Sequence, residues 1–484
     1  MTIIELDIIF ILVRKVENRI KEIIFQTIEK EKLIQNNNKI IVCVSGGPDS
    51  VALLFLLLEL KEQYRLDLVV SHINHKLRGE ESSRDEEFVK NLCKDLGIKF
   101  FSKSFFSIKE KAKKLGVSLQ EYARELRYNY WEKLAQKTGA NKIALGHNWD
   151  DQVETVLMRF LRGAGSLGLS GIPIKRGKII RPLLFVKREQ IENYLKEKKT
   201  PFQKDSSNLK IDYFRNKLRL VLLPLMQKEF SPNIYEILSR TSQIFSEQNN
   251  FIQKETEKIF AKSCSIKKPE KIVLDLRKIK NYNICLRRNL VRLGLAQIGG
   301  SAKELSFQQT ERIVELMERG ESGKKVILDK NIQAEVSAKE IAFYRKKEKA
   351  FNIKITLPGE KFLEKAGVLF KSEILNRKTL PEKIMTKDEF TAFLDWGGLK
   401  TPFYLRNVKP GDVFSPLGMK GKKKLSDFLI DLKVPNWEKN EILVLTSKNK
   451  IAWVMGKRIS EEFKITPDTK KVLKIIAQFQ CKKK

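Results

Sequence analysis

The segment Lys39–Leu60, "KIIVCVSGGPDSVALLFLLLEL", joins two strongly apolar runs through a short turn of serine, glycine, proline and aspartate. The first run, residues 39–44, is short and rich in β-branched residues, and it predicts a buried strand. The second run, residues 51–60, predicts a buried helix. A helix that starts directly after a glycine turn presents unpaired N–H groups and the positive end of its dipole, which together bind anions. The segment therefore predicts a phosphate-binding loop at the carboxyl end of a strand in a parallel sheet.

The residue types of this loop suit a bound nucleotide. Gly46 and Gly47 allow close backbone approach, and Pro48 is tolerated in the first turn of a helix. The predicted nucleotide-binding set is Ser45, Gly46, Gly47, Pro48, Asp49 and Ser50. The loop lacks the lysine of the GxxxxGK[ST] motif, so transfer of a γ-phosphoryl group is poorly supported. An ordinary strand–helix turn explains two glycines equally well.

The pattern around the loop predicts the fold class. From residue 39 to 216, apolar strands such as "LDLVVSHI" and "NKIALGH" alternate with helical patterns such as "SLQEYARELRYNYWEKLAQKTG". This alternation predicts an α/β domain with a parallel sheet and helices on both faces. The predicted divisions are an N-terminal helix in 1–34, the α/β domain in 35–216, a mostly helical domain in 217–350 and a small basic α+β domain in 351–484. Within the third division, strand patterns begin near residue 325.

Composition limits the partners and the compartment. The 94 Lys and Arg against 59 Asp and Glu give a net charge of +35, which favours a polyanion such as nucleic acid. A lysine-rich surface without a specific ligand is the alternative. The five cysteines contain no CxxC pair, which indicates a reducing compartment and excludes common zinc and iron–sulfur patterns. The first apolar run is too short to span a bilayer. We expect an amphipathic helix over 4–34 and a cytoplasmic protein without a membrane partner.

Polar residues gather at the ends of other predicted strands. His72, His75 and His147 are the chain's three histidines, and all lie where strands of the same sheet end. With Asp151 they are one candidate metal site, although contact with a nucleotide explains their placement as well.

The stretch "DDQVET" opens a predicted helix and places Asp151 and Glu154 on one face. Helix capping accounts for these residues. The alternative is a site for Mg²⁺ or for a cationic substrate. Four glycines in residues 163–171 then suggest a mobile loop over the site.

Longer motifs resemble a known family. "SGGPDS" is similar to the pyrophosphate-binding (PP) loop of N-type ATP pyrophosphatases, which cleave ATP between the α and β phosphates. "HINHKLRGEES", "ARELRY", "GHNWDDQVETVLMRFLRGAGSLGLSGI", "RPLL", "DSSNLKIDYFRNKLR" and the C-terminal "GDVFSPLGMKGKKKLSDFLIDLKVP" follow in this order. Together they resemble tRNA(Ile)-lysidine synthetase over roughly residues 40 to 460.

The resemblance implies a reaction. The family joins free L-lysine to the cytidine at the first anticodon position of a tRNA(Ile) with a CAU anticodon. ATP first adenylates the base, and lysine then displaces AMP. The resemblance makes Asp49 and His147 catalytic candidates, with Asp151 and Glu154 as partners of the lysine amine. That amine has a reference pKa near 10.4, so a carboxylate base is needed. Mg²⁺ is expected to enter with ATP, with Asp49 or Asp150 as candidate ligands.

Basic residues are the expected tRNA contacts. Residues 401–484 hold 19 Lys and Arg against 8 Asp and Glu. The predicted tRNA contacts are Arg124, Arg127, Arg215, Arg219, Lys422, Lys423 and Lys424. Two other functions stay open: a PP-loop tRNA thiolase, which the missing CxxC pair disfavours, and a non-catalytic RNA-binding protein with a degenerate nucleotide fold. The sequence also leaves a homodimer open.

Overall fold

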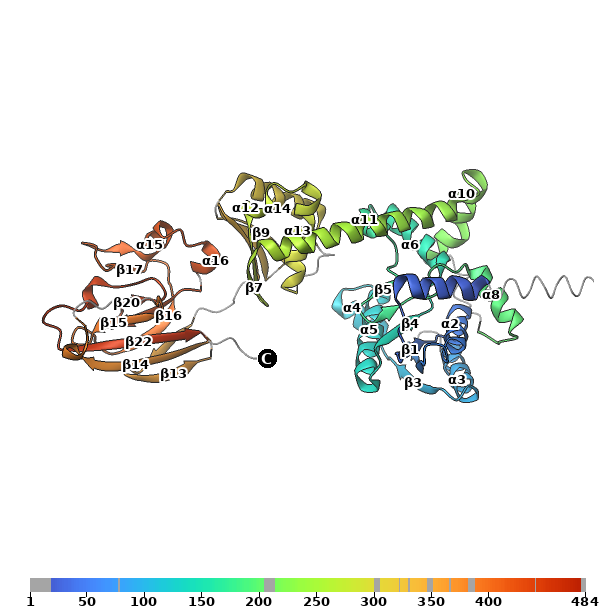
Figure 1. The fold of residues 1–484 in the computed structure, drawn as a ribbon, viewed down its shortest axis with the longest axis horizontal. Helices are drawn as coiled ribbons and strands as arrows, with labels where there is room; N and C mark the ends of the chain where they lie inside the picture. Colours follow the sequence, from blue (N-terminus) through green and yellow to red (C-terminus); the bar gives the residue numbers. More distant parts are fainter. Residues whose placement is uncertain are drawn as a thin grey trace, which may run out of the picture. The chain divides into compact units, whose positions relative to one another are not determined.

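The fold is described from a computed structural model, which divides the chain into two compact units, residues 1–251 and 252–484 (Figure 1). The described residues are 19–76, 79–203, 214–299, 305–321, 323–329, 331–345, 351–364, 367–381, 388–439 and 441–479. Within these ranges, no helix has both the length and the apolar character that a membrane span requires.

The first unit is built on one six-stranded sheet with the order β3-β2-β1-β4-β6-β5. Its strands are β1 (Lys39–Cys43), β2 (Asp67–Asn74), β3 (Lys99–Ser104), β4 (Lys142–Leu145), β5 (Lys175–Arg176) and β6 (Ile179–Ile180). All neighbours pair in parallel except β5, which runs antiparallel to β6. The predicted parallel sheet is confirmed, with β1 between β2 and β4.

Helices cover both faces of this sheet (Figure 1). They are α2 (Pro48–Glu59), α3 (Glu80–Asp95), α4 (Ile108–Leu115), α5 (Leu119–Thr138), α6 (Trp149–Leu161), α7 (Ser166–Leu169) and α8 (Arg188–Glu197). Alternate residues of a strand point to opposite faces. Accordingly, Ile40 and Val42 pack with α2, α3 and α8, whereas Ile41 and Cys43 pack against Trp131 of α5. The burial of β1 on both faces explains its unbroken apolar sequence.

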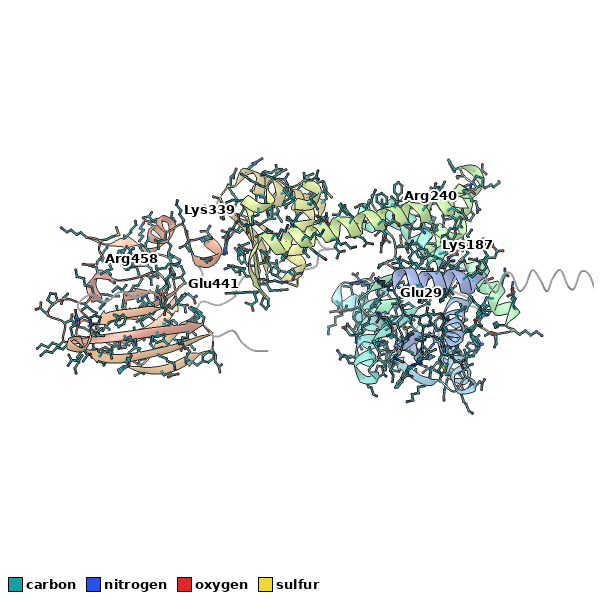
Figure 2. The ribbon with its side chains drawn as sticks, in the orientation of Figure 1. Glu29, Lys187, Arg240, Lys339, Glu441 and Arg458 are labelled. Carbon is teal, nitrogen blue, oxygen red and sulfur yellow. The ribbon has the colours of Figure 1, made fainter. Side chains whose placement is uncertain are left out.

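The N-terminal helix belongs to the first core. Residues 19–31 are helical, and Ile20, Ile24 and Ile28 are buried at the three- or four-residue spacing of one helix face. The hydroxyl of Tyr64 donates to Glu29 Oε1 at 2.6 Å, and Figure 2 labels Glu29 on this helix. The predicted helix is confirmed here, whereas residues 4–18 lie outside the described residues.

The first unit continues past residue 216 into further helices. These are α9 (Phe214–Lys217), the π-helix η2 (Leu218–Leu222), α10 (Leu223–Glu229) and the start of α11 (Ile234–Ser263). Leu218 and Leu223 pack against Trp149 and Val153 of α6. Lys187, labelled in Figure 2, forms an ion pair with Glu236 at 2.8 Å. Because these contacts are made with α6 and α8, the compact unit extends to residue 251.

The second unit begins with a five-stranded antiparallel sheet of order β7-β8-β11-β10-β9. Its elements are β7 (Cys264–Lys268), β8 (Lys271–Asp275), α12 (Leu276–Ile279), α13 (Ile284–Gln297), α14 (Phe307–Arg319), β9 (Lys324–Asp329), β10 (Ile332–Val336) and β11 (Glu340–Arg345). The last three strands match predicted ones. Strands β7 and β8 were not predicted, so the segment expected to be mostly helical also contains a sheet.

Two antiparallel sheets, β12-β16-β19-β20-β21 and β13-β14-β22-β15, share the last apolar core. Their strands are β12 (Asn352–Ile355), β13 (Gly359–Leu363), β14 (Val368–Asn376), β15 (Thr391–Asp395), β16 (Phe403–Asn407), β19 (Leu443–Ser447), β20 (Lys450–Val454), β21 (Arg458–Ile459) and β22 (Lys471–Phe479). A hairpin of β17 (Val413–Phe414) and β18 (Lys423–Lys424) leads into α15 (Leu425–Asp431), followed by α16 (Asn436–Lys439). Lys271 of β8 pairs at 3.3 Å with Glu441, which is labelled in Figure 2.

Candidate active site

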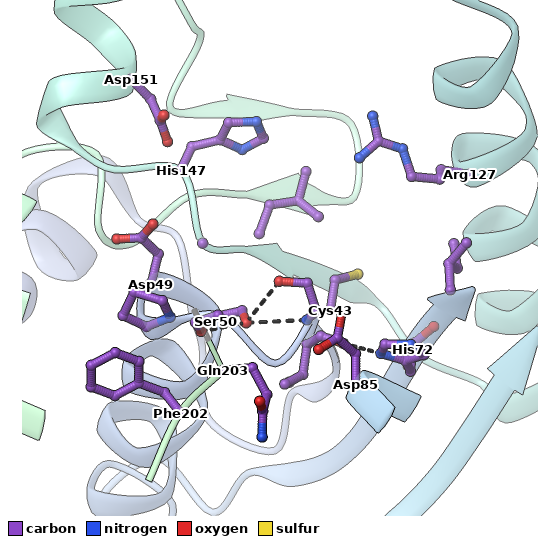
Figure 3. A pocket seen from close by; sticks show the side chains of 18 of the residues that line it. Cys43, Asp49, Ser50, His72, Asp85, Arg127, His147, Asp151, Phe202 and Gln203 are labelled. Atoms are coloured by element: carbon purple, nitrogen blue, oxygen red, sulfur yellow. Dashed lines mark hydrogen bonds between the residues drawn. The ribbon is translucent and has the colours of Figure 1, made fainter. Parts of the chain in front are cut away.

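A cleft of about 970 Å³ opens where strands β1, β2 and β4 end. Ligands of open parallel sheets bind at this edge, where the helix N-termini also converge. Figure 3 shows Asp49, His147 and Asp151 along one side of the cleft, with Arg127 and His72 on the other. The strand order therefore brings together residues that lie about a hundred positions apart in the sequence.

The predicted phosphate loop is folded in advance of any ligand. Ser50 Oγ accepts the N–H of Ser45 at 3.1 Å and donates to the Gly47 carbonyl at 2.9 Å. Gly46 has a φ of +99°, a conformation that residues with a side chain rarely adopt. These bonds hold the turn closed, so the first N–H groups of α2 stay directed at the cleft.

A glycine that the motif analysis missed closes the other side of this turn. A Cβ atom at Gly146, just after β4, would lie 3.1 Å from backbone atoms of Asp49 and Ser50. A side chain at this position would have to push the first turn of α2 away by a few tenths of an ångström, so glycine suits the close approach of β4. The requirement depends on the pairing of β4 with β1, so the local sequence does not reveal it.

Asp49 is the acidic group of the loop. Its Oδ1 accepts from Asn148 Nδ2 at 2.8 Å, and its Oδ2 lies 3.9 Å from Arg188 Nη2. Burial raises the pKa of Asp49 to about 6, and Arg188 offsets part of this shift. The ionised carboxylate is thus incompletely compensated and faces the cleft, where a cation would stabilise it.

The described residues fit Mg²⁺ carried by a nucleotide rather than a protein-built metal cluster. No group of three His, Cys, Asp or Glu that could hold a metal occurs in the described part of the chain, so the histidine metal site is wrong there. His72 instead lies with Nδ1 2.9 Å from the Val44 carbonyl. Asp150 accepts the N–H of Arg188 at 2.8 Å and does not line the cleft. Because Mg²⁺ often uses one or two carboxylates plus substrate phosphates, Asp49 is the better candidate ligand.

Asp151 has one carboxylate oxygen in a helix cap and the other beside three arginines, Arg188, Arg215 and Arg219. It forms a capping box with Asn148, in which its Oδ2 accepts the Asn148 N–H at 3.1 Å. Its Oδ1 lies 2.9 Å from Arg215 Nη2 and lines the cleft. The capping interpretation is therefore confirmed for one oxygen, and the other remains at the cleft wall.

Glu154 is deeper and already paired. It is 2% exposed and does not line the cleft. Its Oε2 accepts from Arg215 Nε at 2.6 Å and from Arg219 Nη2 at 3.0 Å, and its Oε1 accepts from Arg219 Nε. Both carboxylate oxygens are thus occupied by two arginines that were predicted to bind tRNA. Of the two carboxylates Asp151 and Glu154, only Asp151 lines the cleft.

The two arginines of α5 have a different environment. Arg124 and Arg127 line the cleft, and neither forms an ion pair with a carboxylate among the described residues. Arg127 Nε is buried without a hydrogen-bond partner, and burial lowers the pKa of its guanidinium. A buried cation without an acidic partner favours an anionic ligand such as a phosphate.

Comparisons with known proteins agree with this geometry. A PP-loop domain model matches residues 12–226, and a model of the TilS substrate C-terminal domain matches residues 403–476. The tRNA(Ile)-lysidine synthase of Caldanaerobacter subterraneus subsp. tengcongensis is 36% identical over 457 residues, 94% of this chain and 97% of the relative. The chain belongs to the tRNA(Ile)-lysidine synthase family. The tRNA(Ile)-lysidine synthase of Clostridium tetani is 35% identical over 94% of this chain and 97% of its own length.

Among solved structures, a U34-tRNA thiolase, NcsA from Methanococcus maripaludis with its [4Fe-4S] cluster, covers 48% of this chain and 80% of its own at 19% identity, with a TM-score of 0.40. Membership of the tRNA(Ile)-lysidine synthase family confirms the predicted PP-loop fold and favours ligation over the thiolase alternative.

The glycine-rich segment 163–171 does not cover the site of this synthase-family chain. Arg159 Nη1 donates to the carbonyl of Gly168 at 2.9 Å and also to that of Gly171. None of the residues 163–171 lines the cleft. The prediction of a mobile loop over the site is therefore wrong. Hydrogen bonds from Arg159 hold this segment against the C-terminal end of α6, away from the cleft.

Helix α8 supplies cleft residues that the sequence analysis missed. Arg188, Glu192 and Lys196 line the cleft at a spacing of four, so they share one face of the helix. The spacing itself was readable in the sequence. Which way that face turns depends on the packing of α8 against α2, which only the tertiary structure shows.

His75 and His147, which line the cleft, are expected to stay neutral well below pH 6. Burial and neighbouring arginines lower the pKa of His75 and of His147 to about 4, from an ordinary value of 6.5. The unfolded chain therefore binds more protons between pH 4 and 6.5. The stability contributed by these rings is present above pH 6.5 and falls as the pH drops toward 4. Histidine NMR titration of the folded chain checks this, and a His147 resonance that titrates near 6.5 would contradict it.

Proposed function

We propose that the chain joins free L-lysine to the cytidine at the first anticodon position of a tRNA(Ile) with a CAU anticodon. ATP is converted to AMP and pyrophosphate in the process. The observation that carries the proposal is a preformed phosphate loop without a Walker lysine, which shares one cleft with Asp49, Asp151 and unpaired arginines. The family membership supports the use of ATP and of tRNA(Ile). The compartment that suits these substrates is the cytoplasm.

The first step activates the base. The cytosine O2 attacks the α-phosphorus of ATP, the bond to the bridging oxygen breaks, and pyrophosphate leaves. The N–H groups at the start of α2 would stabilise the leaving charge, with Arg188 and Lys196 of α8 beside them. Asp49 would hold Mg²⁺, which supplies further neutralisation of the phosphate oxygens when bound. Its incompletely compensated carboxylate suits that role.

The second step transfers lysine. The neutral ε-amine attacks C2 of the activated base, the C2–O2 bond breaks, and AMP leaves with the O2 atom. Asp151 Oδ1 lies at the cleft wall, 2.9 Å from Arg215 Nη2, and it would bind the ammonium and accept its proton once the lysine displaces that guanidinium. Glu154 would act with it only if Arg215 and Arg219 moved away; otherwise it positions these two arginines. His147, neutral at pH 7, would contact the nucleotide or the base.

Basic residues of both units would bind the tRNA phosphates. Arg124 and Arg127 are the better candidates in the cleft, because Arg215 and Arg219 already bind carboxylates.

The deciding experiment incubates the full chain with unmodified tRNA(Ile), ATP and lysine, and analyses products by mass spectrometry. We expect a nucleoside heavier than cytidine by one lysine minus water, together with AMP and pyrophosphate in equal amounts. ADP and orthophosphate as main products would contradict the proposal. RNA binding without ATP turnover would instead support the non-catalytic alternative.

The lysine-rich loop of the second unit carries a separate prediction. Lys422 and Lys424 are exposed, whereas Lys423 pairs with Asp431. Replacing Lys422 and Lys424 with alanine should weaken tRNA binding about tenfold and reduce the slope of log affinity against log salt by about 1.5, because each phosphate contact releases counterions. Binding measured across a salt series tests this, with Lys423→Ala as the control of smaller effect. An unchanged slope would identify these lysines as solvated surface charge.

A further inference from the structure

An exposed aromatic and basic surface lies where α6 ends and α9 begins. Phe160 is 64% exposed and Leu161 is 50% exposed in the last turn of α6, and Phe214 is 45% exposed at the start of α9. The guanidinium carbon of Arg162 lies 5.5 Å from the centre of the Phe214 ring. An arginine stacked on an exposed ring presents two flat, polarisable surfaces to solvent.

The charge of Arg162 is not neutralised within the described part of the chain, where it forms no ion pair with a carboxylate. A second pair of the same type shows the contrast. Arg288 lies 5.3 Å from the ring of Phe307, which is 62% exposed, but Glu311 binds its guanidinium through two bonds of 2.6 and 2.7 Å. Of these two pairs, Arg162 with Phe214 is the one that combines an exposed ring with a cation available to an anionic ligand.

The pair shares its elements with the candidate active site. Phe214 directly precedes Arg215, whose guanidinium binds Asp151 at the cleft wall. Arg162 follows the helix that starts beside the cleft, and the helical rise places it about 16 Å from Asp151 along the axis. An RNA strand with one base in the cleft could therefore place a nearby nucleotide of the same loop on Arg162 and Phe214.

We infer that Arg162 and Phe214 form a stacking platform for an unpaired base of the anticodon loop, next to the cytidine that enters the cleft. The inference rests on the proposed function and names the part of the substrate that this surface holds. Proteins recognise single-stranded RNA by stacking unpaired bases on aromatic rings and on arginine guanidinium planes. The positive charge suits the phosphate that follows the stacked base.

Charge favours RNA over a second copy of the chain at this surface. Two copies would bring together identical basic patches of a protein whose net charge is +35, and these repel one another. A tRNA loop is instead a polyanion with several unpaired bases. Phe160 and Leu161 extend the apolar area on which such bases could lie.

The test uses tRNA(Ile) that carries 2-aminopurine at one unpaired anticodon-loop position at a time, because stacking quenches its fluorescence. With the unchanged chain, we expect quenching at one position beside the target cytidine. Phe214→Leu keeps an apolar side chain but removes the ring, so this quenching should be lost and KM for tRNA should rise about tenfold. Phe214→Trp keeps an aromatic ring, so its quenching and its KM for tRNA should match those of the unchanged chain. KM for ATP should not change in either variant.

Phe307→Leu is the matched control, because its arginine is already neutralised, and it should leave fluorescence and KM unchanged. Quenching and KM that stay the same in Phe214→Leu would overturn the platform. A shift from dimer to monomer in sedimentation, with RNA stacking intact, would overturn it in favour of a protein interface. Failure of the proposed function is distinguishable, because the unchanged chain would then form no AMP with tRNA and lysine.

Discussion

Replacing Asp49 with asparagine is expected to lower tRNA-dependent AMP formation by about a hundred- to a thousandfold, the usual cost of losing one preorganised charge at a reacting phosphate. Asparagine is almost the same size and can still accept the bond from Asn148 Nδ2. The change therefore removes the negative charge that would hold Mg²⁺ and leaves the loop intact. Single-turnover formation of AMP from ATP, with tRNA and lysine in excess, measures the effect.

The same substitution should stabilise the fold at neutral pH. The pKa of Asp49 in the folded chain is about 6, above the ordinary 3.8, so the folded state binds more protons between these values. Stability therefore falls as the pH rises from 3.8 to 6, and the penalty persists at pH 7. Because the side chain is partly exposed, we expect a gain of about 1 kcal/mol for Asp49→Asn above pH 6 and no gain below pH 4.

Asp150→Asn is the matched control, because Asp150 accepts a backbone N–H from Arg188 and does not line the cleft. It should lower AMP formation far less than Asp49→Asn does. Equal losses in the two variants would show that Asp49 has no special role at the phosphate loop.

The second large effect is expected at Glu154. Glu154→Gln removes a buried charge that two arginines share, and it leaves Arg215 and Arg219 without full compensation. Breaking one side of a buried ion pair typically costs 3–5 kcal/mol. Because both arginines are partly exposed, we expect a loss of about 3 kcal/mol in the unfolding free energy of the first unit. Hydrogen exchange of α6 and η2 amides measures this locally.

Asp151→Asn separates stability from chemistry in the same network. Asparagine can still accept the N–H of Asn148, so the helix cap is retained, and the stability loss should be smaller than for Glu154, which is more deeply buried and bonded through both oxygens to the arginines. Lysine transfer should fail, so adenylated tRNA should accumulate. If Glu154→Gln instead left stability unchanged and accumulated the same intermediate, Glu154 would be a direct lysine ligand, and the positioning role argued from its burial would be wrong.

Local sequence was sufficient for the phosphate loop and for the sheet around it. The loop is decided by residues within a few positions of one another: Gly46 takes a left-handed φ, and Ser50 closes the turn on Gly47. Strand β1 is buried on both faces, so it had to be an apolar run. Repeated βα units then fix which strand ends meet at one edge, which is why the cleft could be predicted from spacing.

Only the tertiary structure shows which residues far apart in the sequence form ion pairs or pair as strands. Glu154 binds Arg215 and Arg219, which lie 61 and 65 positions away, and no local pattern distinguishes such arginines from ones that bind phosphate. The sequence predicts the same tRNA-binding role for Arg124 and Arg127, yet these two line the cleft without a carboxylate partner among the described residues. Strand β8 likewise pairs with β11 across some 65 residues, and β7 then pairs with β8 at the edge of that sheet. Short-range propensity determines which helices and strands form. Pairing between charged side chains depends on which of these elements pack together, and the folded structure alone decides that.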